Sequence, residues 1–254
     1  LKKCYLSYGV RFNAFYLLGP GDFYEYTEGI VSDTNTYSSG EIVQSYYNIE
    51  PRLNMAYVLN QANSFKFSYT RNTQNLHLLQ NSNSSTPTDI WISSSNNVKP
   101  AIGDQICLCY FRNFADNKYQ FSSEVYYKWM QNQIELKNGA ELRANEFLEG
   151  ELLFGKGKAY GLELMIRKKY GRLTGWLSYT LSRTEKLIDG INDNNWYPAK
   201  KYETHEISIV GIFDLNNKWS LSATWVYNTG NAVTFPSGKY EIDGKVEFYY
   251  TERN

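Results

Sequence analysis

Hydrophobic and polar residues alternate along most of the chain. From Cys4 to Tyr16 every second residue is apolar or aromatic, and the residues between them include Ser7, Arg11 and Asn13. A period of two predicts β-strand, because successive side chains of a strand point to opposite faces. The same test predicts an all-β fold of about nine strands with no helix. The predicted strands are Lys3–Leu17, Tyr46–Leu59, Ser64–Arg71, Gln105–Phe114, Tyr119–Met130, Tyr160–Lys168, Leu173–Thr184, Glu206–Leu215 and Trp219–Asn228.

The connections between these strands alternate in length. Short polar turns cover residues 60–63, 115–118, 169–172 and 216–218, and long segments cover residues 18–45, 72–104, 131–159, 185–205 and 228–254. In an antiparallel meander every second connection lies at the same end, so the long segments gather on one side. Nothing in a soluble β-sandwich requires all the long loops to lie at one end, whereas an outer-membrane barrel has short periplasmic turns and long outer loops. The sequence therefore predicts one partial domain, residues 1–254, of a transmembrane β-barrel with long extracellular loops.

Aromatic residues agree with that interpretation. Phe, Trp and Tyr make up 17% of the chain, and several lie near the ends of the predicted strands, where the interfacial girdles of a membrane barrel lie. Those beside the short turns are Tyr57, Phe65, Tyr119 and Trp219, and those toward the long loops are Tyr47, Tyr69, Tyr179 and Tyr227. A mean hydropathy of -0.52 does not exclude a barrel, because only alternate residues meet lipid. No run approaches the roughly 18 apolar residues of a membrane helix.

Charge and glycine content exclude two classes of ligand. With 26 basic and 26 acidic residues the chain lacks the basic excess that nucleic acid requires, so no nucleic-acid partner is expected. The glycines of "GKGKAYG", residues 155–161, resemble a phosphate loop, but such a loop needs a helix after it. A period-two segment follows instead. This stretch is therefore predicted to be strand.

The residues that could support catalysis are few. Cys4, Cys107 and Cys109 match no zinc spacing or disulfide framework and are predicted to be small packed residues. His77 and His205 have no nearby nucleophile, so neither a metal site nor a cofactor is expected and the chain is predicted not to be an enzyme. The carboxylates of the polar, water-exposed face of the barrel wall are expected to form ion pairs, namely Glu50 with Arg52, Glu124 with Lys128 and Glu163 with Arg167.

Proline and glycine residues within the predicted strands indicate positions where the sheet is irregular or closely approached. Pro51 has no N–H for a ladder, so a bulge or the loop-proximal end of the strand is expected there. Gly161, Gly175 and Gly211 are expected where the wall bends or where another group approaches closely.

Three stretches also resemble a known family. "EPRLNMAYVLN", "FGKGKAYGLELMIRKKYGRLTGWLSYTLSRTE" and "YNTGNAVTFPSGKYE" are similar to the barrel of TonB-dependent receptors of the Bacteroidetes type, and the resemblance runs from about Tyr5 to the last residue. It implies a barrel of 22 strands in the outer membrane of a Gram-negative bacterium, a plug domain inside it, and energised uptake of a scarce nutrient ligand. The implied partners are outer-membrane lipid, TonB through the plug region, the ligand and a surface lipoprotein.

Parts of the family pattern are not found in these residues. There is no plug, no TonB box and no terminal aromatic strand signal, and about nine strands are far fewer than 22, so the chain is expected to be a middle-to-late part of the barrel. Such a piece would have two open sheet edges, and we expect it to be stable only with its missing strands.

Aromatic residues of the long loops are the candidate ligand contacts. Trp91 in "TDIWISSS" and Trp196 with Tyr197 in "DNNWYPAK" could stack on a sugar or another flat ligand, or they could anchor their own loops. The sequence does not distinguish a glycan from a peptide, a siderophore or a vitamin. The alternative to a receptor segment is a soluble or surface-attached all-β ligand-binding module, which membrane partition would separate from it. A hydrolase is disfavoured, because no nucleophile constellation is present.

Overall fold

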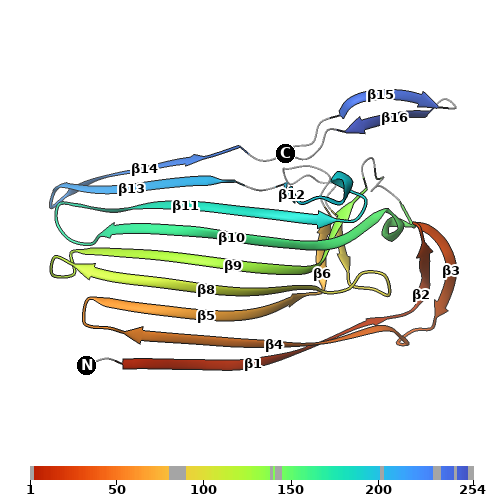
Figure 1. Ribbon diagram of the computed structural model, residues 1–254, viewed down its shortest axis with the longest axis horizontal. Helices are drawn as coiled ribbons and strands as arrows, with labels where there is room; N and C mark the ends of the chain where they lie inside the picture. The colour runs from red at the N-terminus through yellow and green to blue at the C-terminus, as the bar shows by residue number, and fades with distance from the viewer. Residues whose placement is uncertain are drawn as a thin grey trace.

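Nearly all of the regular structure in this protein is antiparallel β-sheet. The computed structural model describes residues 3–79, 90–137, 140, 145–200, 203–230, 236–242 and 245–250. Their main feature is a ten-stranded sheet in the order β1-β4-β5-β8-β9-β10-β11-β13-β14, with β12 paired to β11 (Figure 1). Its long strands are β1 (Lys3–Leu18), β4 (Ile42–Val58), β5 (Asn63–Gln74), β8 (Ala101–Phe114), β9 (Tyr119–Leu136), β10 (Leu152–Lys168), β11 (Leu173–Ile188), β13 (His205–Asn216) and β14 (Trp219–Asn228). The predicted meander is confirmed.

The remaining elements belong to the long connections. Figure 1 shows the short turns together at one end of the sheet and the long connections at the other. The long connections contain β2 (Gly21–Thr27), β3 (Ile30–Tyr37), β6 (Leu76–Leu79), β7 (Ile90–Ser93), the 3-10 helices η1 (Leu148–Glu151) and η2 (Asn192–Asn194), and β12 (Tyr197–Pro198), and beyond β14 lie β15 (Pro236–Ile242) and β16 (Lys245–Tyr250). Within the described part of the chain, no helix is long and apolar enough to cross a membrane.

Several strands extend further toward the long loops than the sequence predicts. β9 continues to Leu136 rather than Met130, and β10 begins at Leu152 rather than Tyr160. The ladder between them is interrupted by a register shift between Gly155 and Gly157 and then resumes. A shift of one residue moves the following side chains to the opposite face of the sheet. The alternation of apolar and polar residues is therefore lost in the sequence there, although the backbone pairing continues.

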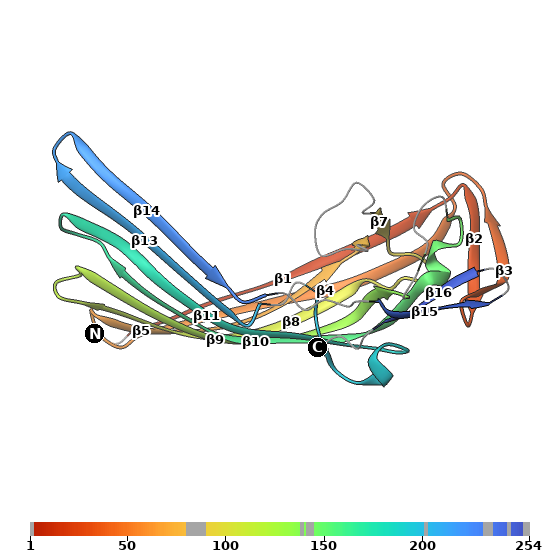
Figure 2. The same ribbon diagram turned by 90° about the horizontal axis from the view of Figure 1, so that it is seen from above.

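One face of the sheet, here called the apolar face, carries apolar side chains in register across the strands. One row runs through Phe67, Leu108, Val125, Leu162 and Leu181 on five successive strands. Much of this face is exposed, since Leu108 is 55% and Val125 54% accessible. The sheet therefore does not bury its apolar face within the described residues. Figure 2 shows it as a single curved and twisted layer with β14 far from β1 at the short-turn end.

The opposite face, here called the polar face, carries the alternate residues. A row in register with the apolar one runs through Lys66, Cys109, Glu124, Glu163 and Thr180. Along each strand the two rows are offset by one residue, as the pleat requires. The period-two prediction of a two-faced sheet is thus confirmed.

Buried apolar clusters form where the long connections pack. One consists of Leu79, Val98, Leu136, Ala140 and Leu152, and the other of Ile188, Ile191 and Tyr197. Both lie at the long-loop end of the strands. The described parts of these connections therefore form small cores with the adjoining strand ends.

The region around Pro51 shows how the sheet opens at the loop end. The β4–β5 ladder ends at the Arg52–Thr70 pair, one residue after Pro51, as expected for a residue without an N–H. Beyond this point the buried Glu50 carboxylate replaces the missing ladder partner, since its Oε1 accepts hydrogen bonds from the Thr73 backbone N–H at 3.1 Å and from Thr73 Oγ1 at 2.5 Å. The carboxylate thus closes the gap between the diverging strands.

Of the three expected ion pairs, only that of Glu50 with Arg52 forms, at 3.6 Å, and Arg11 from β1 contacts the same oxygen at 3.6 Å. In the described part of the chain Glu124 and Glu163 form no ion pair, so those two predictions are wrong. The physical reason is the rise of a strand, about 3.3 Å per residue, which separates residues four apart by about 13 Å.

Two of the three strand glycines meet a close neighbour. A Cβ at Gly161 would lie 2.9 Å from Tyr126 Oη, so the tyrosine ring fills the space that a side chain would need, whereas a Cβ at Gly211 would meet no atom within 4 Å. Gly175 has a φ of +145° and lies against the backbone of Val210. The expected close approach is confirmed for Gly161 and Gly175 but not for Gly211.

Candidate ligand site at the long-loop end

A cavity of about 380 Å³ lies on the polar face where the β6–β7 hairpin folds over the sheet. Figure 2 shows β7 standing above one side of the sheet near the long-loop end. The floor comes from β5, β8, β9 and β11, and the cover from the hairpin. The lining residues are Asn72, Thr73, Gln74, His77, Leu78, Ala101, Ile102, Gly103, Lys128, Met130, Asn132, Gln133, Ile134 and Lys186.

Four amides and two lysines supply most of the polar groups of this cavity, beside apolar residues such as Ile102 and Met130. Lys186 is held in place, since its Nζ donates to Glu135 Oε2 at 3.0 Å and to the Ile134 carbonyl oxygen at 3.3 Å. Lys128 lies along Gly103, where a Cβ would come within 3.0 Å of its Cε. The amides offer hydrogen-bond donors and Lys128 adds a cation, whereas the charge of Lys186 is paired with Glu135, so the lining suits a ligand with hydroxyl, carbonyl or anionic oxygens.

The β6–β7 hairpin is positioned by its own alternation. Leu79 on β6 and Ile90 and Ile92 on β7 pack into the first apolar cluster. The residues between them, including Leu78 and Trp91, face the other way and are exposed. Burial of the first set fixes the hairpin over the sheet. Leu78 of the exposed set and the buried His77 both line the cavity.

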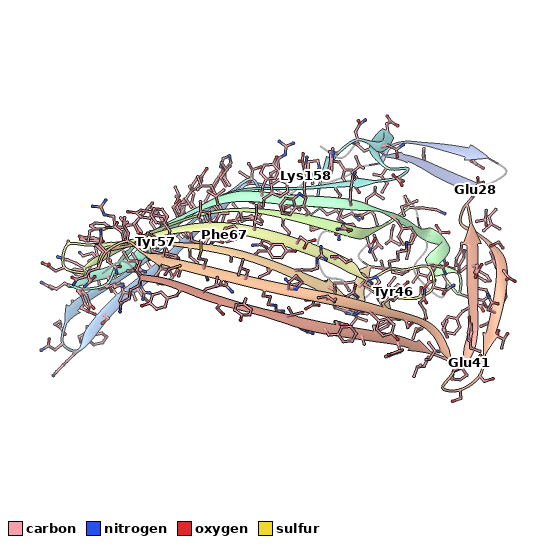
Figure 3. The ribbon with its side chains drawn as sticks, turned by 60° about the horizontal axis from the view of Figure 1, so that its bottom comes forward. Glu28, Glu41, Tyr46, Tyr57, Phe67 and Lys158 are labelled. Atoms are coloured by element: carbon pink, nitrogen blue, oxygen red, sulfur yellow. The ribbon has the colours of Figure 1, made fainter. Side chains whose placement is uncertain are left out.

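Hydrogen bonds link the long connections to one another. Asn97, which follows β7, donates from Nδ2 to the Tyr24 carbonyl at 2.8 Å and to Glu149 Oε2 at 2.6 Å. The Tyr24 hydroxyl donates to Glu146 Oε1 at 2.6 Å, and this bond raises the pKa of Tyr24 above its ordinary value. The β2–β3 hairpin, whose tip and base are marked by Glu28 and Glu41 in Figure 3, is thereby joined to the β6–β7 and η1 connections. Three segments that are distant in the sequence thus form one unit above the sheet.

His77 is the buried titratable group of the hairpin. It is 5% exposed, and its Nε2 lies 3.3 Å from Ser94 Oγ. Burial lowers the pKa of His77 below its ordinary value, because the charged imidazolium would lose its hydration.

Acidification is therefore expected to open the β6–β7 hairpin. Below pH about 6.5 the opened state gains a proton on His77 that the closed state does not bind, so opening is favoured by up to about tenfold per pH unit until the lowered pKa is reached. Hydrogen exchange of residues 76–79 and 90–93, corrected for intrinsic rates, should show this increase between pH 7.5 and 5.5. A His77→Gln variant keeps a hydrogen-bonding group but does not titrate, and its exchange should lack the increase. Equal pH dependence in both proteins would contradict the assignment.

The structure places the three predicted ligand contacts in different environments. Trp91 is 60% exposed and pairs across the hairpin with Leu78, which lines the cavity, but Trp91 itself is not among the lining residues. Trp196 lies under Lys158, whose Nζ is 4.1 Å from the ring centroid. Lys158 belongs to the apolar face of β10, where it pairs with Trp129. The two tryptophans are thus associated with opposite faces of the sheet.

Tyr197 is buried rather than exposed. It is 1% accessible and packs with Ile188 and Ile191, and Leu153 packs against this cluster. This burial fits the alternative that Tyr197 anchors its own loop, because the η2 connection folds back on β11 through the Lys186–Tyr197 pairing. A ligand-binding role for these aromatic residues stays a prediction.

The cavity residues themselves were not found from the sequence. They come from segments between positions 72 and 186, and only pairing of β5, β8, β9 and β11 brings them together. The one available signal was that the polar face of these strands continues as amides and lysines toward the long loops, as in Asn72, Gln74 and Lys128.

The apolar face ends in a band of aromatic and charged residues at the long-loop end. Tyr69, Ile106, Tyr127, Tyr160 and Arg183 form one row across the strands. Charged pairs lie just beyond this row: Arg71 donates to Asp104 at 2.8 and 3.0 Å, and Lys158 and Arg183 contact Glu185 at 3.1 and 2.8 Å. At the other end aromatic residues lie beside the short turns, as Figure 3 shows for Tyr57. Polar interfacial chemistry therefore borders the exposed apolar face on both sides.

Comparison with protein families gives a match over residues 3–252 to the model described as TonB dependent receptor-like, beta-barrel. The family consists of receptors of the Gram-negative outer membrane, not of enzymes. Comparison with curated proteins gives no match.

Among solved structures, the ferric-catecholate import receptor Fiu from E. coli K12 is similar with a TM-score of 0.58 and 13% sequence identity over 97% of this chain and 35% of that chain. The FrpB iron transporter from Neisseria meningitidis is similar with a TM-score of 0.55 and 13% identity over 88% of this chain and 30% of that chain. This chain thus spans about a third of the length of the structures that it matches, and at this identity the likeness concerns the fold.

Proposed function

Because the chain belongs to the TonB dependent receptor-like β-barrel family, we propose that it forms part of the wall and outer loops of an outer-membrane receptor for energised uptake of a scarce nutrient ligand. The wall is formed by the nine long strands of the meander, as part of a larger barrel of about 22 strands. The outer edges of β1 and β14 have no partner strand among the described residues, and in the barrel they are joined to further strands, because an open edge in lipid would leave backbone groups without partners.

The exposed apolar face carries this proposal. Leu108, Val125 and Leu177 are 55%, 54% and 42% accessible, and they belong to one continuous surface across the strands. On β9 this surface runs from Tyr119 to Trp129, about ten residues, which is the length of a tilted transmembrane strand. A soluble binding module would have to cover an apolar surface of this size, whereas a barrel wall leaves it to lipid.

The cavity on the polar face is the proposed ligand site. It lies at the long-loop end, which we assign to the cell exterior, and its lysines and amides suit an oxygen-rich ligand. We propose that Trp91, which is exposed and is the cross-strand partner of the lining residue Leu78, contacts the ligand, and unchanged ligand affinity in a Trp91→Ala variant would remove this role. Trp196, beside the interfacial band, is better suited to anchor its loop and meet the membrane interface, and the buried Tyr197 to anchor η2.

Energised uptake would also require a plug domain and partner proteins. The family resemblance suggests a plug against the polar face, TonB acting through the plug region, and a surface lipoprotein at the outer loops, with the Bacteroidetes type as the nearest class. The two similar solved structures are named for iron import, but at 13% identity they leave the ligand of this chain open.

Labelling of intact cells tests the proposed topology. In the full-length protein with Cys4→Ser, we expect a membrane-impermeant maleimide to label Ser39→Cys, which lies in the exposed connection between β3 and β4. Gln61→Cys, exposed in the turn between β4 and β5, should be labelled only after the outer membrane is opened. Cys107 and Cys109 are buried and serve as an internal background.

Three results would contradict this topology. They are labelling of both positions in intact cells, labelling in the reverse order, and recovery of the protein in the soluble fraction. The last result would favour the ligand-binding module instead.

A further inference from the structure

Two cysteines and a carboxylate converge on the polar face. Cys107 and Cys109 are two residues apart on β8, so their side chains share a face, and their sulfur atoms lie 3.3 Å apart. Glu124 on β9 is directly opposite Cys109, and its Oε2 is 3.2 Å from Cys109 Sγ. Both cysteines are buried, at 6% and 5% exposure. The three ligand atoms all lie within 4.8 Å of one another.

These distances approach those of a metal coordination site. In a tetrahedral zinc site with Zn–S near 2.3 Å and Zn–O near 2.1 Å, neighbouring ligand atoms are about 3.5 to 3.8 Å apart. The observed 3.3 and 3.2 Å are shorter by about half an ångström or less, which small side-chain rotations can supply. Two sulfur ligands and one oxygen ligand suit zinc, and three protein ligands leave a fourth position for water or another group.

The surrounding charges also favour a cation. Glu124 is directly opposite Glu163 on β10, and Thr180 separates Glu163 from Glu206 in the same row. None of these three carboxylates forms an ion pair with another described residue, and like charges directly opposite each other destabilise a sheet. Lys66, opposite Cys109, is the basic neighbour in this row. Two thiolates and the Glu124 carboxylate carry a formal charge of about minus three, so Lys66 and a divalent cation together would balance the site.

We propose that Cys107, Cys109 and Glu124 form a binding site for a divalent metal ion of the zinc class on the polar face. Binding replaces the two thiol protons, which leave to solvent, and it involves no oxidation or reduction. The ion neutralises Glu124 and joins β8 to β9 midway along the strands. This inference goes beyond the proposed transport function and does not depend on it.

Cobalt provides the test, because cobalt bound by thiolate has a characteristic charge-transfer absorption. The full-length protein is purified in detergent under reducing conditions, stripped with chelator, desalted and titrated with Co²⁺ alone. We expect one Co²⁺ per chain with the thiolate band, and displacement of the band by Zn²⁺. The Cys107→Ser/Cys109→Ser double variant should lose the band, and Glu124→Gln should weaken binding about tenfold or more.

Controls make the result specific to this cluster. Cys4→Ser removes the exposed cysteine of β1 and should leave the titration unchanged. Lys66→Ser removes the neighbouring cation and should therefore tighten Co²⁺ binding. Because this variant keeps both cysteines, it tests the site even if the Cys107→Ser/Cys109→Ser variant folds poorly. A missing band in the reduced wild-type protein would overturn the proposal, as would a band that survives in the double variant. So would a disulfide between Cys107 and Cys109, detected by peptide mass spectrometry of protein denatured without reductant.

Discussion

Arginine in place of Leu177 is expected to reduce sharply the amount of this protein that reaches the outer membrane in folded form. Leu177 lies on the apolar face between Ile166 and Ile209 and is 42% exposed. In the proposed barrel it faces lipid about midway along the apolar stretch of β11 from Leu173 to Arg183. An arginine at the midplane of a barrel wall costs about 2–4 kcal/mol. Quantitative fractionation of the full-length variant, with a folded-state assay in detergent, measures the effect.

The neighbouring residue gives a matched control. Ser178 is one residue further along β11 and lies on the polar face, between Met165 and Ser208. Ser178→Arg places the same side chain on the same strand but away from lipid, and this variant should reach the membrane at close to the wild-type level. Equal losses in the two variants would mean that the two faces of β11 do not differ in environment, and the membrane assignment would fail.

Alanine in place of Gly175 is expected to be the most destabilising single methyl addition in the sheet. Gly175 has a φ of +145°, and a Cβ there would overlap the backbone carbonyl of Val210 on β13. A strained backbone of this kind costs about 1–3 kcal/mol for a residue with a side chain, and forced overpacking adds about 1–3 kcal/mol. We therefore expect the free energy of unfolding of the full-length protein to fall by about 2–6 kcal/mol in a denaturant titration.

Gly211 provides the control, because it is the direct partner of Gly175 across the β11–β13 ladder. A Cβ at Gly211 would meet no atom within 4 Å, and its φ lies outside the left-handed region. Gly211→Ala should leave stability unchanged or raise it slightly, since alanine has less freedom than glycine in the unfolded chain. If the two substitutions had similar effects, the geometry of Gly175 would not be the cause.

The strands were predictable because their signal is local. Every long strand of the sheet was expected within a few residues at its short-turn end, as β8 and β9 show on either side of the turn at 115–118. The two faces of a strand differ in environment, and the sequence records this difference at every second residue. The prediction lost accuracy at the long-loop ends, where the bulge near Gly155 shifts the alternation and the strands enter the packed loops.

Side-chain contacts were much less predictable. Glu163 and Arg167 suggested an ion pair in the sequence, but the strand holds them too far apart. For Tyr197 the sequence left ligand stacking and loop anchoring open, and only the structure shows that it packs against Ile188. Conversely, Cys109 and Glu124 are fifteen residues apart with no recognised spacing, and only the β8–β9 register brings them together.

The sequence by itself determined the all-β class, the meander and its two faces, because these depend on alternation and loop length along one strand at a time. The tertiary structure alone decided the cavity under the β6–β7 hairpin, the burial of Tyr197 and the Cys107, Cys109 and Glu124 cluster. Each of these depends on the register between strands and on how a loop folds back over the sheet. Register is set by pairing energies summed over many residues of two strands, and no single segment of the chain contains that information.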